Sequence, residues 1–126
     1  MIMVTKMKNK INILGTEYAI RRVNAGQDEY MERMQFGGYC DGSAKEIVLL
    51  NIKTCPDWEN EPAASIKAKE NETMRHEIIH AFLNESGLQW CSFIPDKAWA
   101  KNEEMVDWIA IQFPKILKAF KEADCI

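Results

Sequence analysis

The sequence predicts an α+β domain in which a mainly antiparallel sheet comes first and two long helices follow. The first part of the chain, up to about residue 52, alternates apolar and polar residues between turn-forming residues, as strands do. The later part contains two long stretches of helix-forming residues, at about 62–86 and 97–120, with apolar side chains at helical spacing. We expect residues 1–126 to form a single domain, with residues 1–9 as a flexible tail.

The strands are predicted from apolar spacing and from turn signals. The first extended segments are marked by Ile11, Ile13, Tyr18, Ile20 and Val23. Gly15 is expected to bend the chain between them, and Asp28 to cap a short helical turn that ends by Gly37-Gly38. A hairpin follows, because Asp41-Gly42 precedes the run Glu46-Ile47-Val48-Leu49-Leu50-Asn51-Ile52. This nearly continuous apolar run predicts a strand that is covered on both faces.

The two long helices are delimited by proline and glycine. Pro62 suits the first turn of a helix, and Gly87 supplies a stop. The buried face of the first helix is expected to comprise Met74, Ile78, Ala81, Phe82 and Leu83. The apolar side of the second helix is marked by Trp99, Met105, Val106, Ile109, Phe113, Ile116, Leu117 and Phe120. Pro114 lies inside this span and is expected to kink or split the helix.

Charge and composition exclude several kinds of partner. The net charge of −3 and the sequence pI of about 5.4 argue against a nucleic-acid partner, which would need a basic face. No apolar run is long enough to span a membrane, and the start lacks the apolar stretch of a signal peptide. Cys40, Cys55, Cys91 and Cys125 lack C-x-x-C spacing, so we expect reduced thiols and a cytoplasmic protein.

The two histidines of the chain, His76 and His80, stand four residues apart, with Glu77 directly after the first. Residues at i and i+4 share one face of a helix, so both imidazoles can bind one zinc ion. Glu77 is turned by about 100° from His76, and its carboxylate can reach a zinc-bound water without ligating the metal. The pattern predicts a Zn²⁺ site, and the alternative is two surface histidines beside an incidental glutamate.

A catalytic zinc ion usually has three protein ligands and a water, and this chain has no third histidine. The third ligand must then be a carboxylate, a thiolate or a tyrosine. The best candidates lie in Asn102-Glu103-Glu104-Met105-Val106-Asp107. Glu103 and Asp107 share one helix face because they are four residues apart, and Glu104 competes with Glu103.

The pattern H-E-x-x-H followed by N-E-x-x-x-D resembles the gluzincin branch of zinc peptidases. The pattern E-x-x-V-D-x-x-A, from Glu103 to Ala110, is similar to the small ImmA/IrrE-type metallopeptidases, whose relatives are common in phages. The resemblance covers the two helices, about half of the chain. It implies a zincin-like fold in which Glu103 is the third zinc ligand and Asp107 hydrogen-bonds His76. Glu104 is then a solvated charge on the helix.

The chain departs from this resemblance in its small size and in lacking a further histidine to stabilise an oxyanion. That role would fall to Tyr18, Tyr30, Tyr39 or Arg75.

The function implied is a zinc-dependent metalloendopeptidase that hydrolyses a peptide or protein substrate, with Glu77 as the general base. An extended substrate could align along Lys45 to Ile52, although the apolar run there favours an interior strand. One alternative is a zincin-fold module that holds zinc and recognises a protein partner without turnover. Another is a zinc-free interaction protein. The sequence leaves the substrate and the oligomeric state open.

Overall fold

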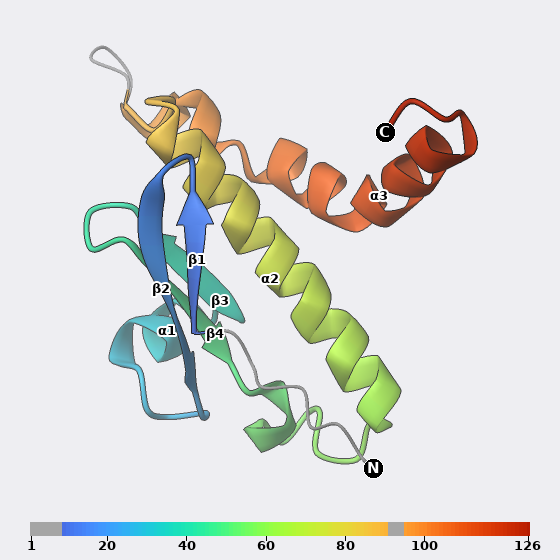
Figure 1. The fold of residues 1–126 in the computed structure, drawn as a ribbon. Coiled ribbons are helices and arrows are strands. Elements are labelled where there is room, and N and C mark those ends of the chain that lie inside the picture. The colour runs from blue at the N-terminus through green and yellow to red at the C-terminus, as the bar shows by residue number, and fades with distance from the viewer. Residues whose placement is uncertain (1–8, 91–94) are drawn as a thin grey trace.

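The computed structural model describes residues 9–90 and 95–126, and Figure 1 shows their arrangement. The longer elements are β1 (Lys10–Ile13), β2 (Thr16–Val23), α1 (Glu29–Met34), β3 (Gly38–Asp41), β4 (Glu46–Leu50), α2 (Ala63–Glu85) and α3 (Glu103–Glu122). Short 3-10 turns lie at Ile52–Thr54, Pro95–Lys97 and Trp99–Lys101. A four-stranded mixed sheet followed by two long helices confirms the predicted α+β class.

The sheet has the strand order β1-β2-β4-β3. The pairs β1/β2 and β3/β4 are antiparallel, and the central pair β2/β4 is parallel, so the sheet is mainly antiparallel, as predicted. The hairpin around Asp41-Gly42 is also confirmed, with Asp41 opposite Glu46. β4 lies between β2 and β3, so the segment from Lys45 to Ile52 is interior, and β3 forms an edge of the sheet.

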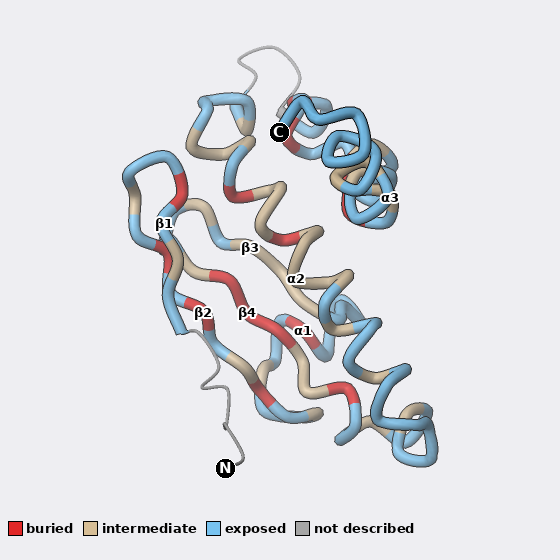
Figure 2. Tube along the Cα trace, turned by 45° about the vertical axis from the view of Figure 1, so that its right-hand side comes forward, coloured by how far each residue is buried: buried red, intermediate tan, exposed pale blue. Residues whose placement is uncertain are grey.

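Each face of the sheet has its own core, which explains why β4 is apolar throughout. On one face, α2 packs through Ala81, Met74 and Ile78 against strand residues that include Ile13, Tyr18, Ile20, Ile47 and Leu49. On the other face, Met31 of α1 packs against Val23 and Val48. Figure 2 shows the buried residues running along β4 between these two layers. α1 is capped as predicted, since the Asp28 side chain accepts a hydrogen bond from Met31 N at 2.9 Å.

The first long helix has the predicted extent within one residue at each end, but the second does not. The chain from Lys97 does not continue as one helix, because Ala98 and Asn102 have non-helical backbone angles. Asn102 instead caps α3, and its side-chain oxygen accepts a hydrogen bond from Met105 N at 2.9 Å. α3 therefore begins at Glu103 and extends to Glu122. Pro114 does not split it, and Figure 1 shows the ribbon changing direction along its length.

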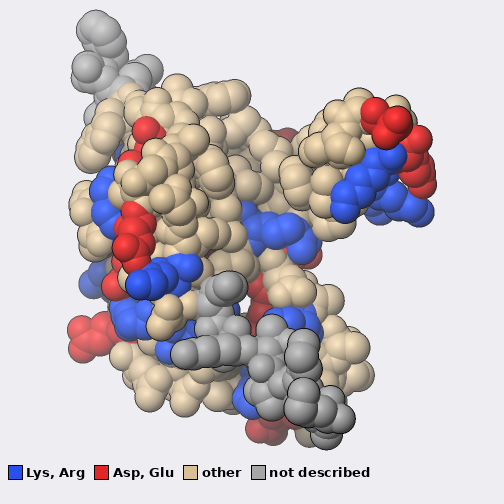
Figure 3. All heavy atoms as spheres, in the orientation of Figure 1, with Lys and Arg blue, Asp and Glu red and all other residues tan. Residues whose placement is uncertain are grey.

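The predicted apolar side of the second helix is only partly covered. Trp99 in the preceding 3-10 turn and Phe113 and Phe120 of α3 keep 57%, 43% and 45% of their surface exposed. The other predicted residues are buried or partly buried: Met105, Val106, Ile109, Ile116 and Leu117. Phe82, which was expected on the buried face of α2, is also exposed. The reason is that α3 packs mainly against α2 and lies away from the sheet. Figure 3 shows its far end standing clear of the body of the molecule.

Three predictions fall partly outside the described residues. Of the predicted tail 1–9, residues 1–8 lie outside them, and the Asn9 carbonyl accepts a hydrogen bond from Ile20 N at 2.8 Å. Cys91 lies outside them as well, whereas Cys40, Cys55 and Cys125 are free thiols. Within the described ranges, no helix has the length and apolar character that crossing a bilayer requires.

The C-terminal end of α2 is fastened to the sheet through Glu85. Its carboxylate accepts hydrogen bonds from Lys45 Nζ at 2.6 Å, Tyr18 OH at 2.6 Å and Thr16 Oγ1 at 2.9 Å. These three donors lower the pKa of Glu85 to about 2. The contact matters for the site described below, because it fixes the same helix that carries both histidines.

Replacing Glu85→Gln should lower the melting temperature at pH 7, because the amide cannot replace the ionised acceptor of three donors. Because the folded-state pKa of Glu85 lies below its ordinary value of 4.5, the ionised carboxylate stabilises the fold fully above pH 4.5. This stabilisation is lost as the pH falls from 4.5 to about 2, so the difference in melting temperature between the wild type and Glu85→Gln should shrink over that range. Thermal unfolding followed by circular dichroism from pH 7 to pH 2 measures this difference. Glu59→Gln, at an exposed loop position, is the control, and a difference that stays constant over this range contradicts the prediction.

Candidate metal centre

α2 presents His76, Glu77 and His80 on the side where it meets both β3 and α3. Ala81 is fully buried against the sheet, which fixes the rotation of the helix about its own axis. Glu77 is 4% exposed, and both histidines are partly buried. The predicted sharing of one face by His76 and His80 is confirmed, since their rings lie edge to face with centroids 4.8 Å apart.

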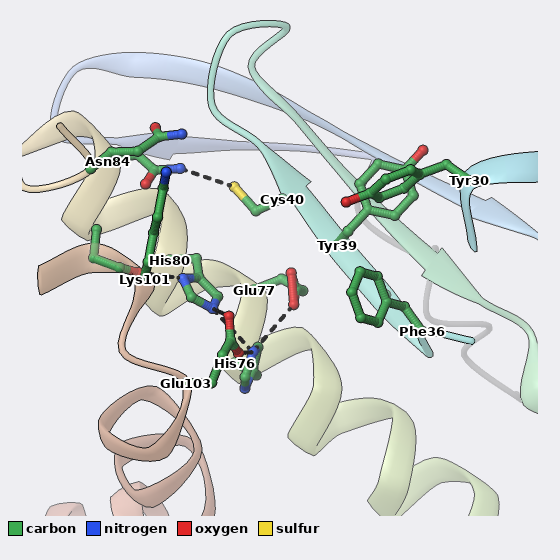
Figure 4. A pocket seen from close by; sticks show the side chains of 13 residues that line it. Tyr30, Phe36, Tyr39, Cys40, His76, Glu77, His80, Asn84, Lys101 and Glu103 are labelled. Atoms are coloured by element: carbon green, nitrogen blue, oxygen red, sulfur yellow. Dashed lines mark hydrogen bonds and ion pairs between the residues drawn. The ribbon is translucent and has the colours of Figure 1, made fainter. Parts of the chain in front are cut away.

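The two histidines and Glu103 converge on one point, as Figure 4 shows. The Nε2 atoms of His76 and His80 are 3.2 Å apart. Glu103 places Oε2 at 3.0 Å from His76 Nε2 and Oε1 at 3.1 Å from His80 Nε2. Among the described residues, these three form the group of His, Cys, Asp and Glu side chains close enough together to hold a metal ion.

The other ring nitrogen of each histidine is held by an acceptor from the segment before α3 or from α3 itself. His76 Nδ1 lies 2.7 Å from Asp107 Oδ1, and His80 Nδ1 lies 2.8 Å from the carbonyl oxygen of Ala100. A carbonyl can only accept, so His80 donates from Nδ1, and Nε2 is the ring nitrogen left to face Glu103. Asp107 has the same effect on His76. Both imidazoles are thus oriented with their free nitrogens toward Glu103.

This donor set fits a divalent cation. Two imidazole nitrogens and a carboxylate lie within 3.2 Å of one another, an arrangement that a positive ion between them would stabilise. Ligands about 2.0–2.1 Å from a tetrahedral zinc ion are about 3.3 Å apart, close to the observed separations. Nitrogen and oxygen donors of this kind are typical of catalytic zinc sites, with one position left for water.

Ala100 holds the segment that brings Glu103 to the histidines. Its backbone N–H donates to the carbonyl of Leu88 at 3.0 Å, and its own carbonyl faces His80. Two residues later, Asn102 starts α3, so Glu103 occupies the first turn directly beside His80. Glu103, rather than Glu104, therefore meets the histidines. No sequence signal marks Ala100, because it acts through its backbone.

Glu77 lies beside this group without joining it. Its Oε1 is 3.5 Å from His76 Nε2, and Figure 4 shows the carboxyl on the sheet side of His76. Burial raises the pKa of Glu77 to about 8, and the negative charges of Glu103 and Asp107 contribute to the rise. A carboxyl in such a position is suited to hold or release a proton near neutral pH.

The helices α2 and α3 are joined by a bond that the sequence did not predict. Pro114 has no backbone N–H, so the carbonyl of Ala110, four residues before it, lacks its helical donor. Arg75 of α2 supplies one, and its Nε donates to the Ala110 oxygen at 2.7 Å. Arg75 is therefore not a simple surface charge. It ties α3 to the turn of α2 that carries His76.

Three of the four candidates for oxyanion stabilisation form hydrogen bonds outside the metal group. Arg75 is engaged by Ala110, and Tyr18 is fully buried with its hydroxyl on Glu85. Tyr39 donates its hydroxyl to Asp28 at 2.8 Å, and burial, aided by that bond, raises its pKa to about 12. Tyr30 lines the pocket beside the histidines but is part of an aromatic cluster.

A pocket of about 400 Å³ opens next to the candidate metal centre. It is lined by His76, Glu77, His80 and Glu103, and also by residues that the sequence did not single out for the site. These additional residues include Phe36, Gly38, Cys40, Asn84, Gln89 and Lys101. Burial, with a contribution from the charge of Glu77, raises the pKa of Cys40 to about 12, so this thiol stays protonated.

Comparison with known proteins adds no assignment: no family model, no curated protein and no solved structure matches the chain. The function is therefore inferred from the geometry of the site.

Replacing Arg75→Met should lower the free energy of unfolding by about 1–3 kcal/mol, because the Ala110 carbonyl is left without a donor. In a Pro114→Ala background the cost should be smaller, since the alanine supplies a backbone N–H to that carbonyl. Urea denaturation of the four proteins of this double-mutant cycle measures the coupling. Lys118→Met, on the exposed side of α3, is the control. An equal cost of Arg75→Met in both backgrounds would show that Pro114 does not create the need for Arg75.

Proposed function

We propose that this protein is a zinc-dependent metallopeptidase of the gluzincin kind. The observation that carries the proposal is the convergence of His76 Nε2, His80 Nε2 and the Glu103 carboxylate, at 3.0–3.2 Å from one another. It is supported by the acceptors that hold both outer ring nitrogens, as catalytic zinc sites require. The free thiols of Cys40, Cys55 and Cys125 agree with the cytoplasm as its compartment.

In the proposed reaction Glu77 transfers a proton from the attacking water to the leaving amine. His76, His80 and Glu103 would hold the zinc ion, which would polarise the scissile carbonyl and lower the pKa of a water toward about 7. Glu77 accepts a proton from the attacking water and passes it to the amine that leaves when the C–N bond breaks. Glu77 is buried beside His76, which keeps its carboxyl close to the candidate metal ligands.

The edge strand β3 offers the backbone that can align an extended peptide. Leu50 N donates to Gly37 O at 3.0 Å, so the bonded pairs of the β3/β4 ladder run through Tyr39 and Asp41. The N–H and C=O groups of Gly38 and Cys40 then point away from β4, toward the free edge. Both residues line the pocket, so a peptide added there would lie beside the histidines.

A zinc-binding module without turnover is the second candidate. The observation in its favour is that Tyr18, Tyr39 and Arg75, three of the four groups considered for oxyanion stabilisation, are hydrogen-bonded elsewhere. Such a module would use the same metal site and pocket to hold a protein partner. Measured turnover separates the two candidates.

The purified protein is expected to contain one zinc ion per chain by elemental analysis. His80→Ala and Glu103→Ala should lose it, whereas Glu104→Ala, which removes the neighbouring carboxylate, should keep it. Asp107→Asn should lower zinc affinity by about 10- to 100-fold, because the imidazole of His76 loses its ionised acceptor. Competition with a chromogenic chelator measures these affinities. Stoichiometric zinc in Glu103→Ala would show that the third ligand is assigned wrongly.

Glu77→Gln should lower kcat for peptide hydrolysis by about 10²- to 10⁴-fold and leave one zinc ion per chain, because the amide cannot accept the proton. Mass spectrometry of a mixed peptide library incubated with each zinc-loaded protein measures cleavage. Glu70→Gln, at the N-terminal half of α2 and away from the histidines, is the matched control. Equal cleavage by the wild type and Glu77→Gln would refute the role of Glu77, and absence of cleavage by the wild type would favour the non-catalytic module.

A further inference from the structure

The pocket beside the candidate metal centre has two chemically different ends. Figure 4 shows Tyr30, Tyr39 and Phe36 at one end and Asn84 and Lys101 at the other. The histidines, Glu77 and Glu103 lie between these ends. A ligand that fills the pocket therefore meets an aromatic wall on one side of the metal group and a polar, positively charged wall on the other.

The aromatic end is a preformed apolar surface. The Tyr30 ring packs edge to face against Phe36 and Tyr39, with centroids 5.9 Å and 5.0 Å away. Tyr39 is fixed by its hydrogen bond to Asp28, which also caps α1. Tyr30 and Phe36 still keep 43% and 39% of their surface exposed. Covering them with an apolar side chain removes this surface from water, which favours binding.

The opposite end combines a cation with two amides. Lys101 is the one Lys or Arg among the described residues that line the pocket, and it is exposed. Asn84 and Gln89 close against the turn after β3, where a Cβ on Gly42 would come within 2.7 Å of the Asn84 amide and 2.6 Å of Gln89 Oε1. The Asn84 amide already donates to Cys40 Sγ at 3.7 Å, so the Lys101 ammonium is the group at this end that is suited to a carboxylate.

The free edge of β3 connects the two ends. Tyr39 lies on the α1 side of the sheet, and Cys40 lies on the α2 side. In a strand added to this edge, alternate side chains point to these two faces. Side chains on the α1 side meet the aromatic wall, and the strand continues toward Asn84 and Lys101 at the end of β3.

We propose that this pocket selects an extended peptide that carries a large apolar side chain at the aromatic end and a carboxylate at the Lys101 end. The inference rests on the proposed function, because it names the substrate class of the same site. The carboxylate is either the side chain of an acidic residue or the C-terminus of the peptide. Both have the same chemistry at Lys101.

The test is peptide binding to the zinc-loaded Glu77→Gln protein, measured by fluorescence anisotropy. The probes are fluorescein-labelled octapeptides of glycine and alanine in which one position is Phe or Ala and another is Glu or Gln, at every relative spacing. All of them are amidated, and a further Gln set ends in a free carboxylate. We expect one spacing of Phe and carboxylate to bind best. Preference for the amidated Glu set or for the free-carboxylate set identifies the source of the carboxylate.

Two variants test the two ends. Lys101→Ala should weaken binding of the carboxylate probes by about three- to fivefold at low salt and leave the amidated Gln probes unchanged. Tyr30→Ala should weaken binding of the Phe probes about fivefold and leave the Ala probes unchanged. Lys97→Ala and Trp108→Ala, exposed residues outside the pocket lining, are the matched controls. Zinc content shows that each variant is folded, and Phe36→Ala replaces Tyr30→Ala if that protein fails to fold.

An equal loss for carboxylate and amidated probes in Lys101→Ala overturns the proposal, because it would mean that Lys101 contacts the peptide backbone or a reacting oxygen. Equal binding of all probes by the parent protein overturns it as well. Cleavage of a mixed library by the wild type without these preferences would contradict the selectivity and leave the proposed function standing. Selective binding without cleavage would support the selectivity and contradict the proposed peptidase function.

Discussion

The position of α3 depends on its contacts with a single helix. Among the described elements α3 packs mainly against α2, so this helix largely determines where Glu103 lies. The bond from Arg75 to the Ala110 carbonyl fixes the middle of α3, and the contacts of Glu103 and Asp107 with the histidines fix its start. Pro114 makes the first of these possible, because it removes the N–H that would otherwise compete for the carbonyl. A helix-breaking residue thus serves to join two helices.

The same junction concentrates charge. Glu77, Glu103 and Asp107 surround two imidazoles whose outer nitrogens are already committed to acceptors. Burial and these negative charges raise the pKa of Glu77, and a cation at the convergence of the Nε2 atoms would balance the excess of acceptors. The metal group and the general base of the proposed reaction therefore depend on one packing arrangement.

The sheet contributes to the site in a different way. α2 is held over one face by Ala81 and at its C-terminal end by Glu85, which places the histidines level with the edge strand β3. α1 lies on the opposite face, and Tyr30 of α1 and Phe36, which follows that helix, lie at the same edge. The pocket has an aromatic end and a polar end because the α1 and α2 layers, which cover opposite faces of the sheet, meet at the β3 edge.

Features that depend on local spacing could be predicted from the amino-acid sequence. They include the α+β class, the hairpin at Asp41-Gly42, the cap at Asp28 and the helix at 62–86, which is correct within one residue at each end. His76 and His80 share a face because four residues make about one helical turn. Most of these features depend on residues close together in the chain.

The tertiary structure set the features that depend on contacts between distant segments. It placed β4 inside the sheet and β3 at its edge, and it began α3 at Glu103 rather than near Lys97. It brought Glu103 rather than Glu104 to the histidines, and it gave Arg75 a partner 35 residues away. Spacing along one helix cannot specify how a second helix docks against it. That docking is set by the packing, the Ala100 segment and the carbonyl that Pro114 leaves without a donor.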